Sequence, residues 1–116
     1  MRRTLVTRTW LFVFALISSA GIAYAQDAAL VKKGQEVYAA QKCSVCHAIA
    51  GAGNKANPLD GVGAKLSADE IRHWIVSPTE ATAKAKSTKK PPMPAKYGKL
   101  AAAEIDALVA YMQSLK

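Results

Sequence analysis

The chain has 116 residues, which is enough for one domain of ordinary size but not for two. Sixteen basic and eight acidic residues give a formal net charge of +8. No run of lysine and arginine is interleaved with aromatic residues, so the sequence does not indicate nucleic-acid binding, and the moderate basic charge favours acidic protein partners.

The first 25 residues have the pattern of a secretory signal peptide. A basic start with three arginines is followed by an apolar run over residues 10–17 and by a small-residue ending, Ala23-Tyr24-Ala25. The stretch 10–25 is shorter than a helix that crosses a bilayer. We therefore expect cleavage after Ala25, a periplasmic or otherwise extracytoplasmic location, and no stable membrane insertion. An uncleaved anchor is the alternative.

The expected mature domain, residues 26–116, keeps every acidic residue and loses three arginines, so its net charge falls to +5. It opens with a predicted helix. Asp27 is suited to cap this helix, and Leu30, Gly34 and Tyr38 recur on one side of it. Glycine lowers helix stability, so Gly34 within the helix predicts close contact with another helix.

The only cysteines follow this helix, in Cys43-Ser44-Val45-Cys46-His47. Two thiols at this spacing can add to the two vinyl groups on one edge of a haem, and the adjacent imidazole can then bind the iron. Among short motifs this one is specific, because it is the attachment signature of a c-type haem. We therefore expect one covalent haem c per chain, held by Cys43 and Cys46, with His47 as an iron ligand.

Three other interpretations of the cysteine pair stay open. In an oxidising compartment the two thiols could form a small disulfide. A thioredoxin-like dithiol would need β-α-β patterning, which the chain lacks. A zinc site would need further ligands, and His73 is the only other histidine.

The elements that follow alternate between loops and helices. Residues 48–66 are rich in glycine, asparagine and proline, and they predict a loop wrapped around one side of a flat cofactor. A capping box at residues 67–70 opens a short helix that places Ile71, Trp74 and Ile75 on one face. We expect Pro78 to end this helix.

Residues 79–99 are predicted to form a second loop, which is rich in lysine and contains Pro91-Pro92-Met93-Pro94. An apolar stripe predicts a last helix over about residues 101–115, where Ala101 supplies no side-chain cap. No segment has the periodicity of a strand. The predicted class is all-α, with three main helices and two long loops.

The candidates for a second iron ligand are Met93, Met112 and His73. Met112 lies on the apolar stripe of the last helix and is expected to be core, while His73 lies off the apolar face of its own helix. Met93 lies in a loop whose prolines restrict the backbone, which suits a weak thioether ligand. If it is not a ligand, we expect Met93 to shield the cofactor from solvent.

Taken together, residues 28–116 resemble a class I c-type cytochrome of the small bacterial monohaem kind. Gly34 and Tyr38 ahead of the cysteines match the first helix of that family. The run Leu108-Val109-Ala110-Tyr111-Met112 matches its last helix, and Asn57-Pro58-Leu59 matches the loop after the haem motif. The resemblance implies the cytochrome c fold, with these helices and loops wrapped around the haem.

The resemblance also implies roles for single residues. Gly34 and Tyr38 should meet Leu108 and Tyr111 where the first and last helices cross. The carbonyl of Pro58 should accept a hydrogen bond from the second ring nitrogen of His47. The family places its distal methionine at the position of Met93, and Trp74 is expected to contact the haem.

Two filled axial positions would leave no site for a substrate. We therefore expect a monomeric single-electron carrier of a respiratory or related chain, and no enzyme. One alternative is a haem-bearing subunit of a periplasmic dehydrogenase or oxidase complex. Another is a haem sensor or catalyst with an open iron site, which requires that Met93 does not bind.

Six lysines and no acidic residue lie within residues 84–99, the segment expected to surround Met93. In the family that the chain resembles, one edge of the haem is exposed on this side. A positive ring there predicts docking of acidic redox partners. Alternatively, these lysines only keep the protein soluble.

Overall fold

The computed structural model describes the backbone of residues 20–116 and the side chains of residues 27–116. Its helices are, in chain order, α1 (Ala20–Ala40), α2 (Val62–Lys65), α3 (Ala68–Val76), α4 (Pro78–Lys84) and α5 (Ala102–Ser114). Short 3-10 turns lie at Cys43–Val45 and Ala95–Lys99, and two short strands, β1 (Ala48–Ile49) and β2 (Ala52–Gly53), pair as a hairpin. The predicted all-α class is confirmed, and α1, α3 and α5 are the three main helices.

The start of α1 differs from the prediction. This helix begins at Ala20, so Asp27 lies within it and does not cap it. Residues 20–26 include three alanines and no proline, and nothing in their sequence ends a helix. The predicted signal peptide falls mainly on residues that the structure does not describe, and cleavage after Ala25 stays a prediction. Among the described helices, none has the length and apolar character needed to cross a membrane.

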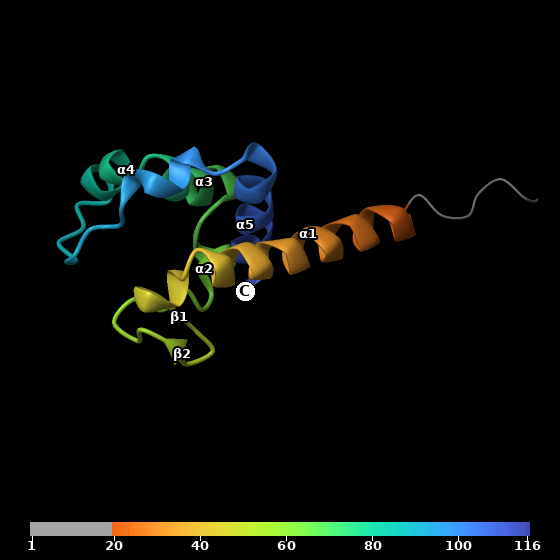
Figure 1. Cartoon of the computed structure of the whole chain (residues 1–116), viewed down its shortest axis with the longest axis horizontal. Coiled ribbons are helices and arrows are strands. Elements are labelled where there is room, and N and C mark those ends of the chain that lie inside the picture. The colour runs from red at the N-terminus through yellow and green to blue at the C-terminus, as the bar shows by residue number, and fades with distance from the viewer. Residues whose placement is uncertain (1–19) are drawn as a thin grey trace, which may run out of the picture.

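Helices α1 and α5 cross in the most extensive contact between elements of the fold (Figure 1). Gly34 lies at the crossing, directly against the Ala107 carbonyl and the Tyr111 side chain. One turn further along α1, the ring of Tyr38 meets Tyr111 edge to face, with centroids 5.7 Å apart. The contact that the family resemblance implied between these helices is present.

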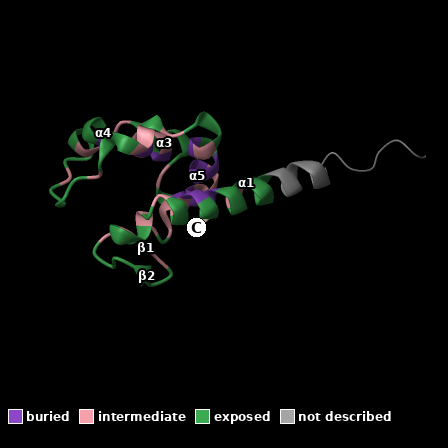
Figure 2. Ribbon diagram, in the orientation of Figure 1, coloured by how far each residue is buried: buried purple, intermediate pink, exposed green. Residues whose placement is uncertain are grey.

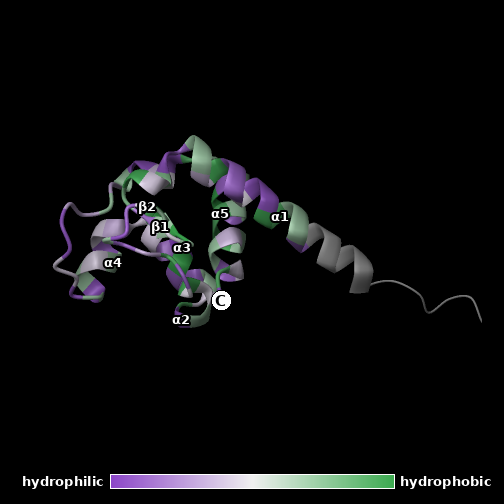
Figure 3. Ribbon diagram, turned by 90° about the horizontal axis from the view of Figure 1, so that it is seen from below, coloured by the Kyte–Doolittle hydropathy of each residue, from purple (hydrophilic) through white to green (hydrophobic). Residues whose placement is uncertain are grey.

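A small apolar core joins this crossing to α3. The buried side chains come from α1, α3 and α5, and they are Val37, Ile71, Ile75, Ile105, Leu108, Val109 and Met112. Figure 2 shows the buried residues gathered where these helices meet, and Figure 3 shows apolar stretches along α3 and α5. The core therefore lies where α1, α3 and α5 meet, and the loops extend away from it on one side.

Helix α3 begins as predicted and ends in a different way. The hydroxyl of Ser67 accepts a hydrogen bond from the backbone N–H of Glu70 at 3.2 Å, which completes the predicted capping box. Helix α3 ends at Val76, but Pro78 then starts α4 inside the segment predicted to be a loop. Proline is well suited to the first turn of a helix, where its missing N–H is not needed, and Glu80 complements the helix dipole there.

The segment predicted to be a loop over residues 48–66 contains the β1–β2 hairpin and α2. Ala50 and Gly51 form its turn, both with positive φ. The hairpin is joined to the following loop by a parallel bridge between Ala48 and Pro58. Strands of two residues are too short to show an alternating pattern, so periodicity could not reveal them.

The crossing at Gly34 gives a first prediction. In Gly34→Ala the new methyl group would lie only 2.6 Å from the Cβ of Tyr111 and closer still to a backbone carbonyl that cannot rotate away. We expect the free energy of unfolding to fall by about 3 kcal/mol, the upper range for overpacking, despite the better helix propensity of alanine. Denaturant unfolding followed by circular dichroism measures this loss. Gln35→Ala, on the exposed side of α1, should change stability little, and an equal loss in both variants would contradict the crossing argument.

Candidate functional site

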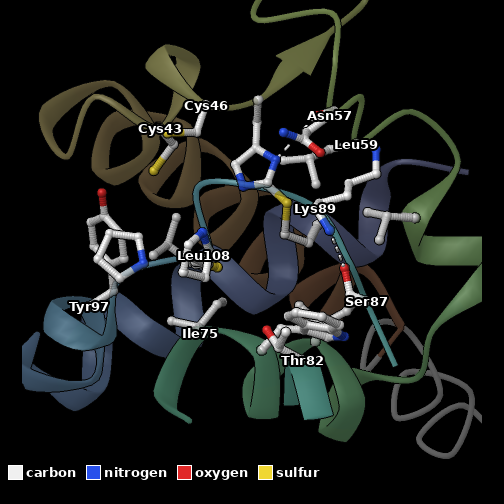
Figure 4. Close-up of a pocket in the computed structure, with 18 of the residues that line it drawn as sticks. Cys43, Cys46, Asn57, Leu59, Ile75, Thr82, Ser87, Lys89, Tyr97 and Leu108 are labelled. Atoms are coloured by element: carbon white, nitrogen blue, oxygen red, sulfur yellow. Dashed lines mark hydrogen bonds between the residues drawn. The ribbon is translucent and has the colours of Figure 1, made fainter. Parts of the chain in front are cut away.

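A cavity of about 450 Å³ lies next to the core, between the cysteine segment and the α3–α4 side of the fold (Figure 4). In Figure 4, Cys43, Cys46 and Asn57 lie along one wall, and Ile75 and Thr82 lie opposite. The helices contribute mainly apolar side chains to the lining, and the loops add two thiols and an imidazole. The volume falls in the range of ligand pockets, and the apolar walls suit a flat organic group.

All the site residues proposed from the sequence line this one cavity. They are Cys43, Cys46, His47, Pro58, Trp74 and Met93. They come from four separate parts of the chain, and only the cysteine motif brings neighbouring residues together. Met112 also lines the cavity but is buried in the core at 6 % exposure, whereas His73 does not line it. Met93 is half-buried.

The turn after α1 directs the cysteine segment towards the cavity. Lys42 adopts a left-handed conformation, and the 3-10 turn Cys43–Val45 follows, with the His47 N–H donating to the Cys43 carbonyl at 2.9 Å. Cys43 is half-buried, which raises the pKa of its thiol chiefly through desolvation, and Cys46 is exposed. Both thiols are free in the structure, so both are available for covalent attachment.

The structure does not favour a zinc site. Among the residues whose side chains are described, no group of three histidine, cysteine or acidic side chains is close enough to hold a metal ion. The fold also lacks the β-α-β arrangement of a thioredoxin-like dithiol within residues 20–116.

The ring of His47 is oriented by a backbone carbonyl, but by a different one from the carbonyl expected. Its Nδ1 lies 3.2 Å from the oxygen of Asn57, one residue before Pro58. The parallel bridge explains the difference. The N–H of Ala48 donates to the same Asn57 oxygen at 3.2 Å, and that register turns this carbonyl towards His47.

This contact decides which nitrogen of His47 is free. When Nδ1–H donates to Asn57, the lone pair of Nε2 remains available for a metal. Burial lowers the pKa of His47, the bond to Asn57 opposes this effect, and the positive charge of Lys89 lowers the pKa further. The neutral imidazole that an iron ligand requires is thus favoured.

Tyr38 supplies an independent test of whether the cavity fits a cofactor. Tyr38 lines the cavity, and its hydroxyl is buried and has no hydrogen-bond partner among the described residues. Buried polar groups normally have a partner, so an unpartnered hydroxyl on a residue that lines the cavity is consistent with a further group that belongs inside. Together with two free thiols and a free imidazole nitrogen, this donor set fits a covalently attached haem.

These features define a c-type haem-binding domain. The chain belongs to the cytochrome c family, because the family model described as Cytochrome c matches residues 31–116. The matched range contains both cysteines, His47 and Met93. No curated protein and no solved structure was matched. The family carries covalent haem c, and the Cys43–His47 motif supplies its attachment site in this chain.

Sequence reasoning missed three residues at this site. Tyr38 was expected at the helix crossing only, Asn57 was passed over in favour of Pro58, and Lys89 was only one of six lysines. Periodicity places Tyr38 on one side of its helix but does not show that its hydroxyl is buried without a partner. The roles of Asn57 and Lys89 depend on contacts between distant segments. The β-bridge that selects Asn57 has no local signature.

The buried hydroxyl of Tyr38 predicts a stability that depends on alkaline pH. Burial, and to a smaller extent nearby negative charge, raises the pKa of Tyr38 from 10.0 to about 12. The neutral form is therefore favoured in the fold. The contribution of the neutral Tyr38 hydroxyl to the free energy of unfolding is complete below pH 10 and is lost as the pH rises through about 12.

We therefore expect the free energy of unfolding of the wild type to fall between pH 9 and pH 11. In Tyr38→Phe this fall should be smaller by about 0.5–1 kcal/mol, after allowance for solvent screening. Guanidinium unfolding of the haem-loaded protein at a series of pH values measures this. Tyr97→Phe, on another part of the cavity wall, should leave the fall in place because Tyr38 is untouched. Identical pH profiles for wild type and Tyr38→Phe would contradict the prediction.

Proposed function

We propose that this cytochrome c is a diffusible single-electron carrier whose haem iron is bound by His47 and Met93. The observation that carries the proposal is the shared cavity, which is lined by both cysteines, by His47 and by Met93, a residue 46 positions after His47 in the sequence. When bound, the haem supplies reversible one-electron chemistry. The chain supplies attachment through two thiols, and its apolar walls exclude water.

The two proposed ligands have different supports. His47 is fixed through Nδ1 by Asn57, which leaves Nε2 for the iron. Met93 lies between prolines that limit the backbone around it. A thioether is a soft neutral donor that favours ferrous iron, and two protein ligands leave no open position for a substrate. This supports electron transfer, the usual activity of the family, over catalysis.

The compartment that we propose is extracytoplasmic, and the support is the sequence of residues 1–25. A basic start, an apolar run and an Ala-x-Ala ending are the marks of a secretory signal. The expected mature chain begins at Gln26, ahead of the residues matched by the family model.

Carbon monoxide tests the proposed ligation. In the reduced haem-loaded protein we expect a sharp low-spin spectrum that carbon monoxide does not change, because both axial positions are filled. Met93→Leu removes the thioether at nearly constant volume, and we expect it to give complete binding of carbon monoxide and a lower reduction potential. Absorption spectra with and without the gas show whether carbon monoxide binds to the iron, and a redox titration measures the reduction potential.

Met112→Leu is the matched control, because Met112 lines the same cavity from the core helix α5. We expect Met112→Leu to keep a low-spin spectrum that carbon monoxide does not change. If the wild type binds carbon monoxide readily, Met93 is not a ligand and the protein is better described as a haem sensor or catalyst. If Met112→Leu opens the iron and Met93→Leu does not, the ligand assignment is wrong.

We further propose that acidic redox partners dock beside the Met93 segment. Six exposed lysines lie along this part of the chain, at positions 84, 86, 89, 90, 96 and 99, and no acidic residue lies between them. Two of the wall-lining residues, Lys42 and Lys89, add positive charge at the cavity itself. Such a field raises the rate of encounter with an anionic partner, and salt weakens it.

An anionic reagent tests this charge distribution. At low ionic strength, Lys86→Glu/Lys90→Glu should slow the oxidation of the reduced protein by hexacyanoferrate(III) about tenfold, and added salt should shrink the difference. Lys32→Glu/Lys33→Glu changes the net charge equally on exposed positions of α1, and should have a smaller effect. Stopped-flow rates measure both variants. Equal slowing would mean that only net charge matters and that the docking proposal fails.

A further inference from the structure

The segment that carries Met93 is weakly fastened to the rest of the fold. Within the described part of the chain, no backbone–backbone hydrogen bond joins residues 88–93 to any other element. Pro91 and Pro92 have no N–H to donate, and the nearest ordered turns are α4 before the segment and the 3-10 turn Ala95–Lys99 after it. A thioether on such a segment needs some other restraint to stay over one point of the cavity.

One side chain provides a link across the cavity. The Nζ of Lys89 donates a hydrogen bond to the carbonyl of Ala56 at 2.8 Å, and the two residues are 33 positions apart. The backbone N–H of Lys89 is itself held by the Ser87 hydroxyl at 3.4 Å, the contact drawn in Figure 4. Lys89 also lines the cavity, so its stem crosses the gap between the two loops.

The acceptor of this bond is part of the segment that orients His47. The N–H of Ala56 donates to the side-chain oxygen of Asn54 at 3.0 Å, which fixes the residue from the other side. Asn57, the next residue, carries the carbonyl that meets the His47 ring. The Lys89 bond therefore ends one residue away from the contact that orients the proximal imidazole.

We propose that Lys89 is a positioning residue, which fastens the Met93 segment to the Ala56–Asn57 segment and so holds the two proposed iron ligands at one cavity. This inference rests on the proposed ligation by His47 and Met93. An ammonium donor suits the task because its bond to a carbonyl is charge-assisted and its long stem covers apolar surface.

The neighbouring lysines do not share this contact. Lys86 lies three residues before Lys89, between α4 and the 88–93 segment, is exposed, and makes no side-chain hydrogen bond within the described part of the chain. It has the same charge and lies seven residues before Met93, whereas Lys89 lies four residues before it. A comparison of the two positions therefore separates the specific bond from the general effect of removing a positive charge.

The experiment uses the haem-loaded protein and three variants. Lys89→Met keeps the apolar stem and removes the donor, Lys89→Arg keeps a donor, and Lys86→Met is the charge-matched control. The first readout is the binding of imidazole to the oxidised protein, since imidazole can enter only when Met93 leaves the iron. We expect the apparent affinity for imidazole to rise about three- to tenfold in Lys89→Met and to stay within twofold of the wild type in the other two variants.

The second readout does not depend on ligand exchange. The ¹⁵N relaxation of the Lys89 and Met93 amides in the reduced protein reports fast motion of the segment, with order parameters near 0.85 for rigid backbone and below about 0.6 for flexible backbone. We expect lower order parameters at residue 93 and at the substituted position in Lys89→Met than in Lys86→Met or the wild type.

The outcomes separate this inference from the function on which it rests. Equal behaviour of Lys89→Met and Lys86→Met in both readouts would overturn the positioning role, while a closed wild-type spectrum would leave the ligation intact. If the wild type binds carbon monoxide at once, the proposed ligation fails. In that case the relaxation data alone decide whether Lys89 fastens the segment. Unchanged order parameters in Lys89→Met would then contradict the positioning role of Lys89.

Discussion

The fold depends on the close approach of α1 and α5 at Gly34. A side chain at this position would collide with the backbone of Ala107, so only glycine lets the two helices come this close. The contact sets the direction in which α1 ends, and the cysteine segment follows within three residues. Val37, Leu108 and Tyr38 pack in the core that these helices share, and Tyr38 and Leu108 also line the cavity. The haem attachment site is in this sense an extension of a helix–helix contact.

The core is small because the domain is built around a space that its own side chains do not fill. Ile71 and Ile75 are buried against α5, but they also face the cavity, together with Leu108 and Met112. A domain of this size buries a modest share of its surface and gains from a covalently held group. Apolar side chains that would otherwise meet water can then pack against the haem, so that attachment and folding support each other.

The sequence predicts the parts of this structure that follow from short-range patterns. The α3 capping box, the apolar stripe of α5 and the cysteine–histidine motif depend on residues within a few positions of each other, and all three were identified. The predictions were wrong for the extension of α1 to Ala20 and for the start of α4 at Pro78. An aspartate can cap a helix or lie within it, and a proline can follow the end of one helix or begin the next.

The parts that could not be predicted depend on contacts between distant segments. Asn57 and not Pro58 meets His47, because a single β-bridge to Ala48 sets the register of two loops. The bond between Lys89 and Ala56 likewise joins two irregular segments, and neither has a pattern that marks it. Periodicity describes how one element faces a core and does not specify which carbonyl of a loop will face a given ring.

The double use of the Asn57 carbonyl has a consequence for the rate of electron transfer. Because this oxygen accepts from both His47 and the backbone of Ala48, the imidazole cannot rotate far without disturbing the bridge between β1 and the following loop. In the proposed ligation, a His47 imidazole restrained in this way would change its geometry little between the two oxidation states of the iron. The reorganisation energy of electron transfer would then stay small, so that a short strand pairing would contribute to the speed of the proposed redox reaction.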